Sequence, residues 1–285
     1  MQTAVRPAAV AGMFYPGASE TLASAVRTHL AEASSGLPAG VEWPKAVIVP
    51  HAGYIYSGPV AAHAYCRLAA GRGTVRRVVL LGPVHRVPVR GLAVPAARAF
   101  ATPLGSIPLD AAAVARALEF PQVRVSEAAH ALEHSLEVQL PFLQTVLEDF
   151  AIVPLAVGDA EAEEVAQVIE ALWGGPETIV VVSSDLSHYH PYAVAQTIDR
   201  ATATAILALD SALDHGQACG AMPINGFALC AHRHRLAPEL LDLRNSGDTA
   251  GDKSRVVGYA AFAFGKAERG TAEPRAEAAM EPADD

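Results

Sequence analysis

The stretch TIVVVSSDLSHYHP (178–191) joins a run of β-branched residues to a cluster of polar ones. Residues 178–184 have the length and composition of a strand buried on both faces, because the apolar residues follow one another without alternation. Asp185, His188 and His190 come directly after this run, so three titratable groups stand just past the end of a predicted strand. The stretch therefore indicates an open sheet whose strand ends carry polar chemistry.

Similar apolar runs alternate with longer segments that are rich in Ala and Leu. The predicted strands lie at 45–50, 75–82, 150–158, 178–184 and 255–265. Segments with helical spacing lie at 21–33, 58–70, 109–120, 132–150, 161–173 and 192–209. This alternation predicts an α/β fold, a three-layer α/β/α sandwich around a largely parallel or mixed central sheet. Residues 91–110 are rich in Pro and Gly and are predicted to form a hairpin.

The chain is expected to form one domain over residues 1–265, because neither an internal repeat nor a linker divides it. Residues 266–285 lose the helical periodicity and carry more acidic than basic side chains. A segment of this kind cannot bury enough apolar surface to fold, so we expect a disordered acidic tail.

Charge and composition exclude two classes of partner. The net charge of −9 argues against binding nucleic acid, which needs a basic surface. The apolar runs are too short to span a bilayer, and the N-terminus does not resemble a signal peptide. The cysteines Cys66, Cys219 and Cys230 are odd in number and widely spaced, as in proteins of a reducing compartment. We therefore expect a cytoplasmic protein with neither a nucleic acid nor a membrane partner.

Two further predicted strands run into a histidine. His51 follows residues 45–50, and His85 follows residues 75–82 within three positions. Ligands of open α/β sheets gather past the carboxyl ends of the strands, where several imidazoles together suit a metal ion. Cys219, in a loop broken by Gly and Pro, is a further candidate ligand.

Other interpretations of these polar residues remain open. A histidine at a strand end often only hydrogen-bonds a carbonyl group, and Asp185 and Ser187 could merely cap the next helix. His130, His134 and Glu137 fall at i, i+4 and i+7, but they lack the glutamate that follows the first histidine in zincins. We expect His134 and Glu137 to line or buttress the site and His130 to be solvated.

Six motifs in order resemble the Memo family, whose prokaryotic members are called AmmeMemoRadiSam system protein B. They are RPAAVAGMFYP (6–16), VPHAGYIYSGPVAAHAY (49–65), LLGPVH (80–85), EHSLEVQLPFLQ (133–144), SSDLSHY (183–189) and CGAMPI (219–224). The resemblance covers roughly residues 5–264. It implies a structure similar to class III extradiol dioxygenases, which are non-haem iron enzymes that open catechol rings. It also implies functional association with an AMMECR1-like protein and a radical SAM protein.

The same resemblance implies a site. It makes His51, His85 and Cys219 the ligands of one divalent or redox-active metal ion, iron or copper, with zinc as an alternative that the soft sulfur would also suit. We assign His188 as a candidate general acid–base. We expect Asp185 to fix the tautomer and orientation of a ligand histidine, with direct binding of the metal by its carboxylate as the alternative. Arg86 stands where family members often carry a second histidine, and its charge favours an anionic ligand.

Taken together, these features predict a metal-binding protein with redox activity on an unidentified substrate. The alternative is a non-enzymatic binding or adaptor protein. The space around these strand ends, called the vestibule below, would receive a peptide or a small anion, or would hold metal for delivery.

Overall fold

Four parallel strands form the centre of the main sheet in the computed structural model, which describes residues 4–35, 37 and 42–266. In spatial order they are β2 (Ala46–Val49), β9 (Thr178–Ser183), β3 (Arg77–Pro83) and β8 (Ala151–Val157). Because all four run the same way, their carboxyl ends lie along one edge of the sheet.

Strands of both directions extend this centre. Next to β2 lies β12 (Val256–Lys266), which runs antiparallel to it. Two more strands pair antiparallel with β12. They are β10 (His188–His190) and β11 (Leu236–Asn245). On the β8 side lie β4 (Leu92–Val94), antiparallel to β8, and β7 (Val123–Val125), parallel to β4. Counted over the described residues, the sheet has nine strands and is mixed. A separate sheet contains β1 (Val5–Arg6), β5 (Ala99–Thr102) and β6 (Gly105–Pro108).

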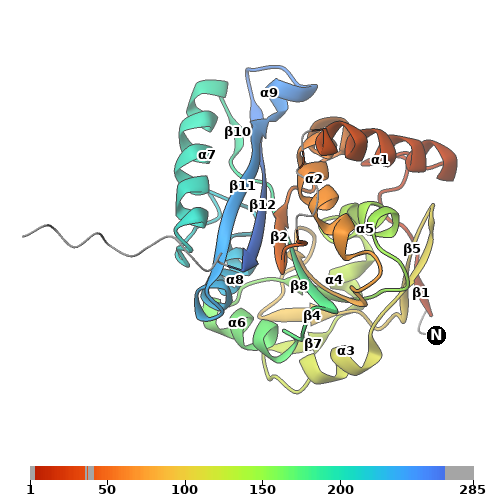
Figure 1. Cartoon of the computed structure of the whole chain (residues 1–285). Helices are drawn as coiled ribbons and strands as arrows, with labels where there is room; N and C mark the ends of the chain where they lie inside the picture. The colour runs from red at the N-terminus through yellow and green to blue at the C-terminus, as the bar shows by residue number, and fades with distance from the viewer. Residues whose placement is uncertain (1–3, 36, 38–41, 267–285) are drawn as a thin grey trace, which may run out of the picture.

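Helices cover both faces of the main sheet (Figure 1). One face carries α1 (Ser19–Ser34), α2 (Tyr54–Leu68) and α5 (Leu140–Val146). The other face carries α3 (Ala111–Ala117), α6 (Ala162–Ala171), α7 (Tyr192–Leu207) and α8 (Ala221–Arg233). The short elements are η1 (Ala69–Gly71), α4 (Glu127–Ala131), η2 (Glu137–Gln139) and α9 (Ser246–Thr249). The predicted α/β/α sandwich is confirmed.

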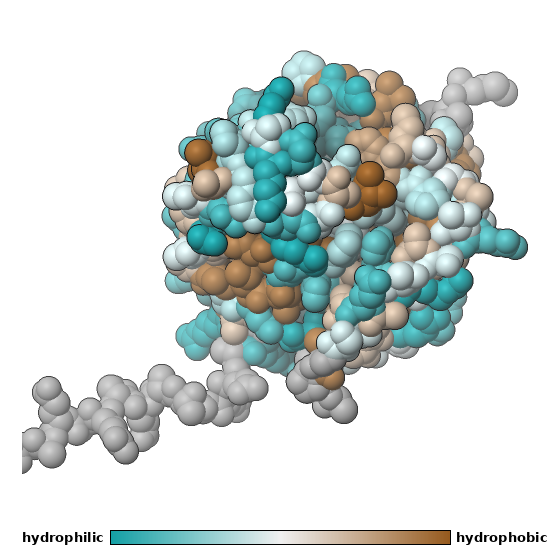
Figure 2. Space-filling view, turned by 90° about the horizontal axis from the view of Figure 1, so that it is seen from above, coloured by the Kyte–Doolittle hydropathy of each residue, from teal (hydrophilic) through white to brown (hydrophobic). Residues whose placement is uncertain are grey.

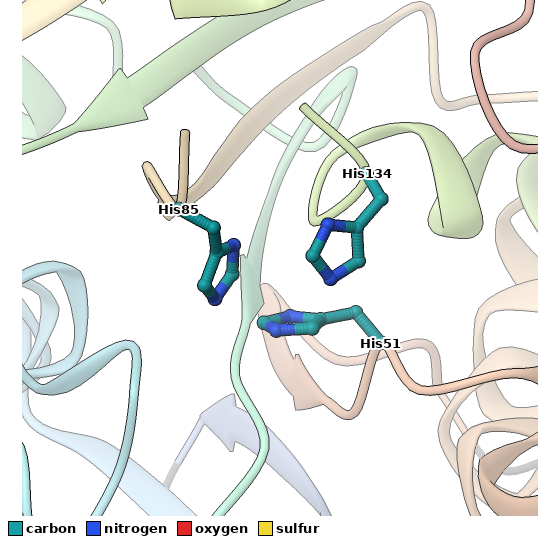
Figure 3. Close-up of side chains that lie close together, drawn as sticks. All are labelled: His51, His85 and His134. Carbon is teal, nitrogen blue, oxygen red and sulfur yellow. The ribbon is translucent and has the colours of Figure 1, made fainter. Parts of the chain in front are cut away.

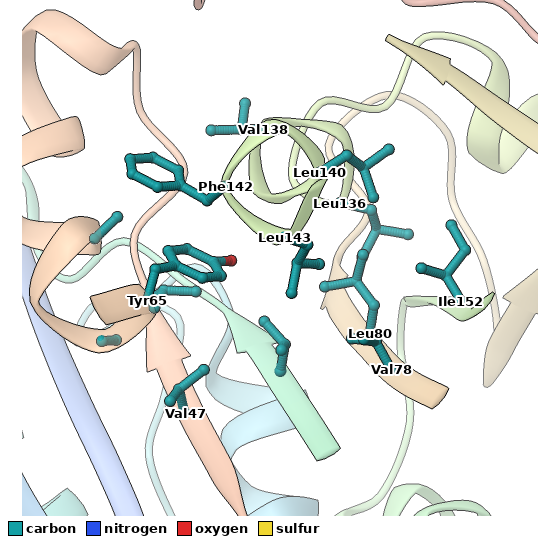
Figure 4. Packing of buried hydrophobic residues seen from close by; sticks show 14 of the residues in the cluster. Val47, Tyr65, Val78, Leu80, Leu136, Val138, Leu140, Phe142, Leu143 and Ile152 are labelled. Atoms are coloured by element: carbon teal, nitrogen blue, oxygen red, sulfur yellow. The ribbon is translucent and has the colours of Figure 1, made fainter. Parts of the chain in front are cut away.

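Successive residues of the central strands pack into different helical layers. Val47 and Val78 belong to the cluster that contains Phe142 of α5, as Figure 4 shows. Their neighbours Ile48 and Val79 belong to the second cluster, on the side of α6 and α8. Side chains of a strand alternate between its faces, so a strand covered on both faces is apolar at every position. This packing accounts for the unbroken apolar runs in the sequence.

The single helix predicted over residues 132–150 is wrong. The carboxylate of Glu133 accepts the backbone N–H groups of His134 and Ser135, which holds this segment in a turn. Pro141 has no N–H to continue a helix and is tolerated only in the first turn, so α5 starts immediately before it.

The structure also places three other predicted segments: the hairpin, the loop around Cys219 and the tail. The hairpin within 91–110 is formed by β5 and β6, whereas β4 joins the main sheet. The loop expected around Cys219 is short, because α8 begins at Ala221 and accommodates Pro223 in its first turn. Of the predicted tail, Lys266 ends β12 and the remainder lies outside the described residues.

The face of the molecule in Figure 2 carries separate apolar patches surrounded by hydrophilic side chains. Such a mixture is ordinary for a folded domain. Within the described segments, none of the helices has the length and apolar character needed to cross a membrane.

Candidate metal centre

Three histidine side chains meet past the carboxyl ends of β2 and β3. His51 follows β2, His85 follows β3, and His134 lies in the turn between α4 and η2; Figure 3 shows their rings around a common space. Each ring offers one nitrogen, and these nitrogens all lie within 4.8 Å of one another. The ring centroids of His85 and His134 are 4.6 Å apart. Imidazole groups suit zinc, copper, iron and nickel, so the cluster has the composition of a transition-metal site.

Glu133 orients His85. One carboxylate oxygen lies 2.9 Å from Nδ1 of His85, and the other accepts the backbone N–H of the same residue at 2.6 Å. Burial alone would raise the pKa of Glu133, but these bonds and the N–H of Ser135 lower it to about 2. An ionised carboxylate only accepts hydrogen bonds, so in neutral His85 the proton is on Nδ1 and the lone pair is on Nε2.

His51 and His134 are held in the neutral form that a metal ion requires. Burial, with a contribution from the neighbouring histidines, lowers the pKa of His51 well below its ordinary value. Burial also lowers the pKa of His134 to about 4. Nδ1 of His134 lies 3.3 Å from the carboxylate of Glu133 without a well-aligned hydrogen bond, and the ring packs on Phe14 with centroids 4.6 Å apart. This set of three imidazole donors therefore fits a metal ion.

The Cys219 thiol lies against His51. Its Sγ is 3.3 Å from Nε2 of His51 and 3.6 Å from the carbonyl oxygen of Asp185. Nitrogen and sulfur atoms that share one ion, at bond lengths of about 2.1 and 2.3 Å, lie about 3–4 Å apart. Burial, helped by the nearby Asp185, raises the pKa of the thiol to about 12, so Cys219 is protonated when no ion is present. Two of the predicted ligands, His51 and His85, therefore cluster with His134, which was predicted only to line or buttress the site. The third predicted ligand, Cys219, lies beside His51.

Asp185 and His188 lie next to this cluster. Oδ1 of Asp185 accepts the backbone N–H of His51 at 2.7 Å, so the carboxylate holds the main chain of His51. Burial raises the pKa of Asp185 to about 7. Burial lowers the pKa of the half-buried His188, and the charge of His85 acts in the same direction. Tyr189 has a φ of 61°, a left-handed conformation that is rare for an aromatic residue, and the pairing of β10 with β12 shifts there.

A buried ion pair, which the sequence did not reveal, supports the turn that carries His134. Arg6 donates to a carboxylate oxygen of Glu137 at 2.6 Å, and the two side chains are 1% and 0% exposed. The same guanidinium donates to the carbonyl oxygens of His130 and Glu133, each at 2.6 Å. Glu137 also accepts the hydroxyl of Tyr15 at 2.6 Å. Glu137 therefore buttresses the site, and it does so through the N-terminal segment.

The expectation that His130 is solvated is wrong. The residue is 1% exposed, and its Nε2 lies 2.9 Å from the carbonyl oxygen of Ala93 in β4. Burial lowers its pKa to about 4. The broken helix is the reason: α4 is a separate short helix, capped by Ser126, and its histidine faces the sheet.

A cleft of about 560 Å³ gives access to the cluster. Its wall includes His85, Arg86, Val87, His215, Cys219 and Met222. Arg86 is exposed, and no carboxylate of the described residues lies within 4.0 Å of its guanidinium. The cleft therefore combines two candidate ligands with an unpaired cation.

Residues 6–263 match the family described as Memo-like protein. A MEMO1 family protein of Metallosphaera sedula is 36% identical over 91% of this chain and 99% of its own length. Another, of Methanopyrus kandleri, is 38% identical over 91% of this chain and 98% of its own length. The chain belongs to the Memo family. In Aquifex aeolicus a further MEMO1 family protein is 35% identical over 91% of this chain and 99% of its own length.

The Memo fold also resembles a solved structure of an uncharacterized protein from Escherichia coli K12. The TM-score is 0.51 at 16% sequence identity, over 75% of this chain and 98% of that one. This likeness shows a shared fold alone.

Proposed function

We propose that this Memo family protein binds one metal ion through His51, His85 and His134, with Cys219 as a further donor. We propose that it carries out a redox reaction on a small molecule at that ion. One observation carries the proposal: three ring nitrogens lie within 4.8 Å of one another beside a cleft.

Iron or copper suits the proposed donors best, with zinc as the alternative. Imidazole binds all three metals, and a thiolate adds preference for Cu(I) and zinc. The nearest carboxylates are engaged elsewhere, Glu133 with the His85 ring and Asp185 with the His51 backbone. The site thus differs from the two-histidine, one-carboxylate triad of non-haem iron oxygenases. A bound ion would supply a Lewis acid and, if it is iron or copper, a redox centre.

The surrounding residues suit a proton transfer next to the ion. His188 is half-buried near His51 and His85, and its lowered pKa leaves the imidazole neutral and able to take a proton at neutral pH. Arg86 in the cleft wall would pair with an anionic group of the substrate. Apolar wall residues such as Val87 and Met222 would cover the rest of it.

Oxygen uptake by the metal-loaded protein, measured with a panel of catechols, tests this proposal. We expect uptake with at least one catechol when iron or copper is bound. His188→Ala should keep the metal and lose turnover, whereas His190→Ala, its neighbour on β10, should behave like wild type. Fully loaded protein that consumes no oxygen with any catechol would contradict catechol oxidation and favour the second candidate.

That second candidate is a non-enzymatic binding or adaptor function, in which the vestibule receives a peptide or a small anion or holds metal for delivery. It is favoured by the unpaired Arg86 and by large apolar side chains that are exposed close in the chain to the site. Ile55 and Leu132 are 67% and 63% exposed. Such a protein would bind an anionic ligand without turnover, and Arg86→Ala would weaken that binding.

A further inference from the structure

The side-chain amide of Gln139 has a defined direction. Its Nε2 lies 2.9 Å from the carbonyl oxygen of Pro50, and its Oε1 lies 2.8 Å from the hydroxyl of Tyr65. Because a carbonyl oxygen only accepts, the amide nitrogen must face Pro50, and Tyr65 then donates to Oε1. The second proton of Nε2 is directed at Oγ of Ser183, which is 2.8 Å away.

The hydroxyl of Ser183 therefore has no proton left for His51. Oγ of Ser183 lies 2.6 Å from the carbonyl oxygen of Ser135, so its single proton goes to that acceptor. One lone pair of Oγ accepts from Gln139, and the other faces Nδ1 of His51 at 2.8 Å. A hydroxyl offers one proton and two lone pairs, so all three contacts are satisfied only when Nδ1 donates.

From this assignment of protons and lone pairs we infer that Gln139 and Ser183 are positioning residues. They hold the proton of neutral His51 on Nδ1 and leave the lone pair of Nε2 free for the ion. The use of Nε2 as a ligand rests on the proposed function. The place of the proton follows from hydrogen bonds within the protein.

Burial of this network favours the Nδ1–H tautomer of His51 strongly. Tyr65, Gln139 and Ser183 are 0% exposed and His51 is 1% exposed, so water cannot replace a lost partner. The other tautomer would place the lone pair of Nδ1 against an oxygen that has no proton to give, and buried groups left unpaired are costly. The freed Nε2 faces the thiol of Cys219 at 3.3 Å. It can accept the thiol proton without an ion, and it needs no tautomer change to bind one.

Nitrogen NMR of the metal-free protein, with labelled histidine at neutral pH, tests the inference. The His51 signals are assigned by their loss in His51→Gln. We expect Nδ1 of His51 to give the signal of a protonated nitrogen and Nε2 that of an unprotonated one. The opposite pattern would overturn the inference. Because no metal is present in this measurement, a protein that failed to bind metal would contradict the proposed function and leave the tautomer result intact.

Three variants separate positioning from general packing. Ser183→Ala should lose the preference for Nδ1–H and weaken metal binding about 10–100-fold, whereas Ser183→Thr keeps the hydroxyl and should restore both. Thr202→Val is the matched control: Thr202 is fully buried, and within the described part of the chain its hydroxyl bonds to the carbonyl of Ile198 in α7 alone. Unchanged tautomer and affinity in Ser183→Ala would overturn the inference. If that variant does not fold, the wild-type spectrum still decides.

Discussion

Glu133 is the residue that joins two of the proposed ligands. Its carboxylate bonds to the ring and the backbone of His85 and also accepts the backbone N–H of His134. A charged acceptor on Nδ1 raises the basicity of Nε2, and such partners of ligand histidines commonly affect metal affinity.

Replacing this carboxylate by an amide should weaken metal binding. We expect Glu133→Gln to reduce metal affinity about 10–100-fold, because the amide has no charge and offers one acceptor in place of two. Titration of the metal-free variant with metal, monitored by isothermal calorimetry, measures this affinity. Glu119→Gln is the control, since Glu119 is 60% exposed and its one ion pair among the described residues is with Arg116. Equal affinity in the two variants would show that Glu133 does not tune the site.

Among the polar residues of the site, the sequence revealed those that follow a strand directly. His51 and His85 were predicted because each comes just after an apolar run. Ser183 and Gln139 were missed, because a hydrogen bond between a strand end and a distant turn leaves no periodic signal in either segment. His134 was placed only at the wall of the site for a related reason, since its position depends on a turn that helical spacing does not predict.

A partner far away in the sequence holds the segment from His130 to Glu137. Arg6 holds three groups of this turn, the carbonyl oxygens of His130 and Glu133 and the carboxylate of Glu137. The N-terminal segment and this turn therefore form one unit, which carries His134.

Removing the guanidinium should destabilise that unit strongly. Arg6→Leu leaves the buried carboxylate of Glu137 without its cation, although the hydrogen bond from Tyr15 remains. We therefore expect the free energy of unfolding to fall by about 3–5 kcal/mol. Chemical denaturation measures this difference. Arg116→Leu breaks an exposed ion pair and should lower the stability by less than about 1 kcal/mol. Similar losses in the two variants would contradict a special role for the buried pair.

The stability that Asp110 gives to the start of helix α3 should depend on pH. Asp110 accepts the N–H of Ala113 at the helix start and pairs with the Nε of Arg77 at 2.7 Å. Partial burial alone would raise its pKa, but these bonds lower it below the ordinary 3.8. A carboxyl with a lowered pKa stabilises the fold above pH 3.8, and that contribution is lost as the pH falls through the lowered value.

Asp110→Ala should therefore lower the free energy of unfolding by about 1–2 kcal/mol near pH 7. The difference from wild type should shrink below pH 3.8 as Asp110 becomes protonated in wild type. Denaturation at several pH values follows this change, with Glu20→Ala in the first turn of α1 as a control for an exposed acid. A difference that stayed constant down to pH 2 would refute the ionic contribution.

Elements were predictable where local pattern and tertiary packing agree. The central strands are apolar at every position because both faces are covered, and their runs predicted them. The helix at 132–150 failed because side-chain bonds from Glu133 and the missing N–H of Pro141 outweighed its helical spacing. Strand β11 was missed because its residues are mostly half-buried at one edge, which leaves a mixed pattern.

The parallel centre of the sheet explains why the site exists. β2, β9 and β3 are adjacent and run the same way, so the residues after them meet at one edge. His51, Asp185 and His85 reach that edge from three separate parts of the chain. The turn before α5 adds His134, and the start of α8 adds Cys219. The fold therefore assembles five polar groups that are far apart in sequence.

Metal analysis of anaerobically purified protein shows whether the three histidines bind one ion together. We predict one ion per chain in wild type and loss of most of it in His51→Ala, His85→Ala and His134→Ala. His232→Ala, at an exposed position of α8, should keep the full amount. Full metal occupancy in any of the three site variants, above all in His134→Ala, would contradict a joint site of three histidines.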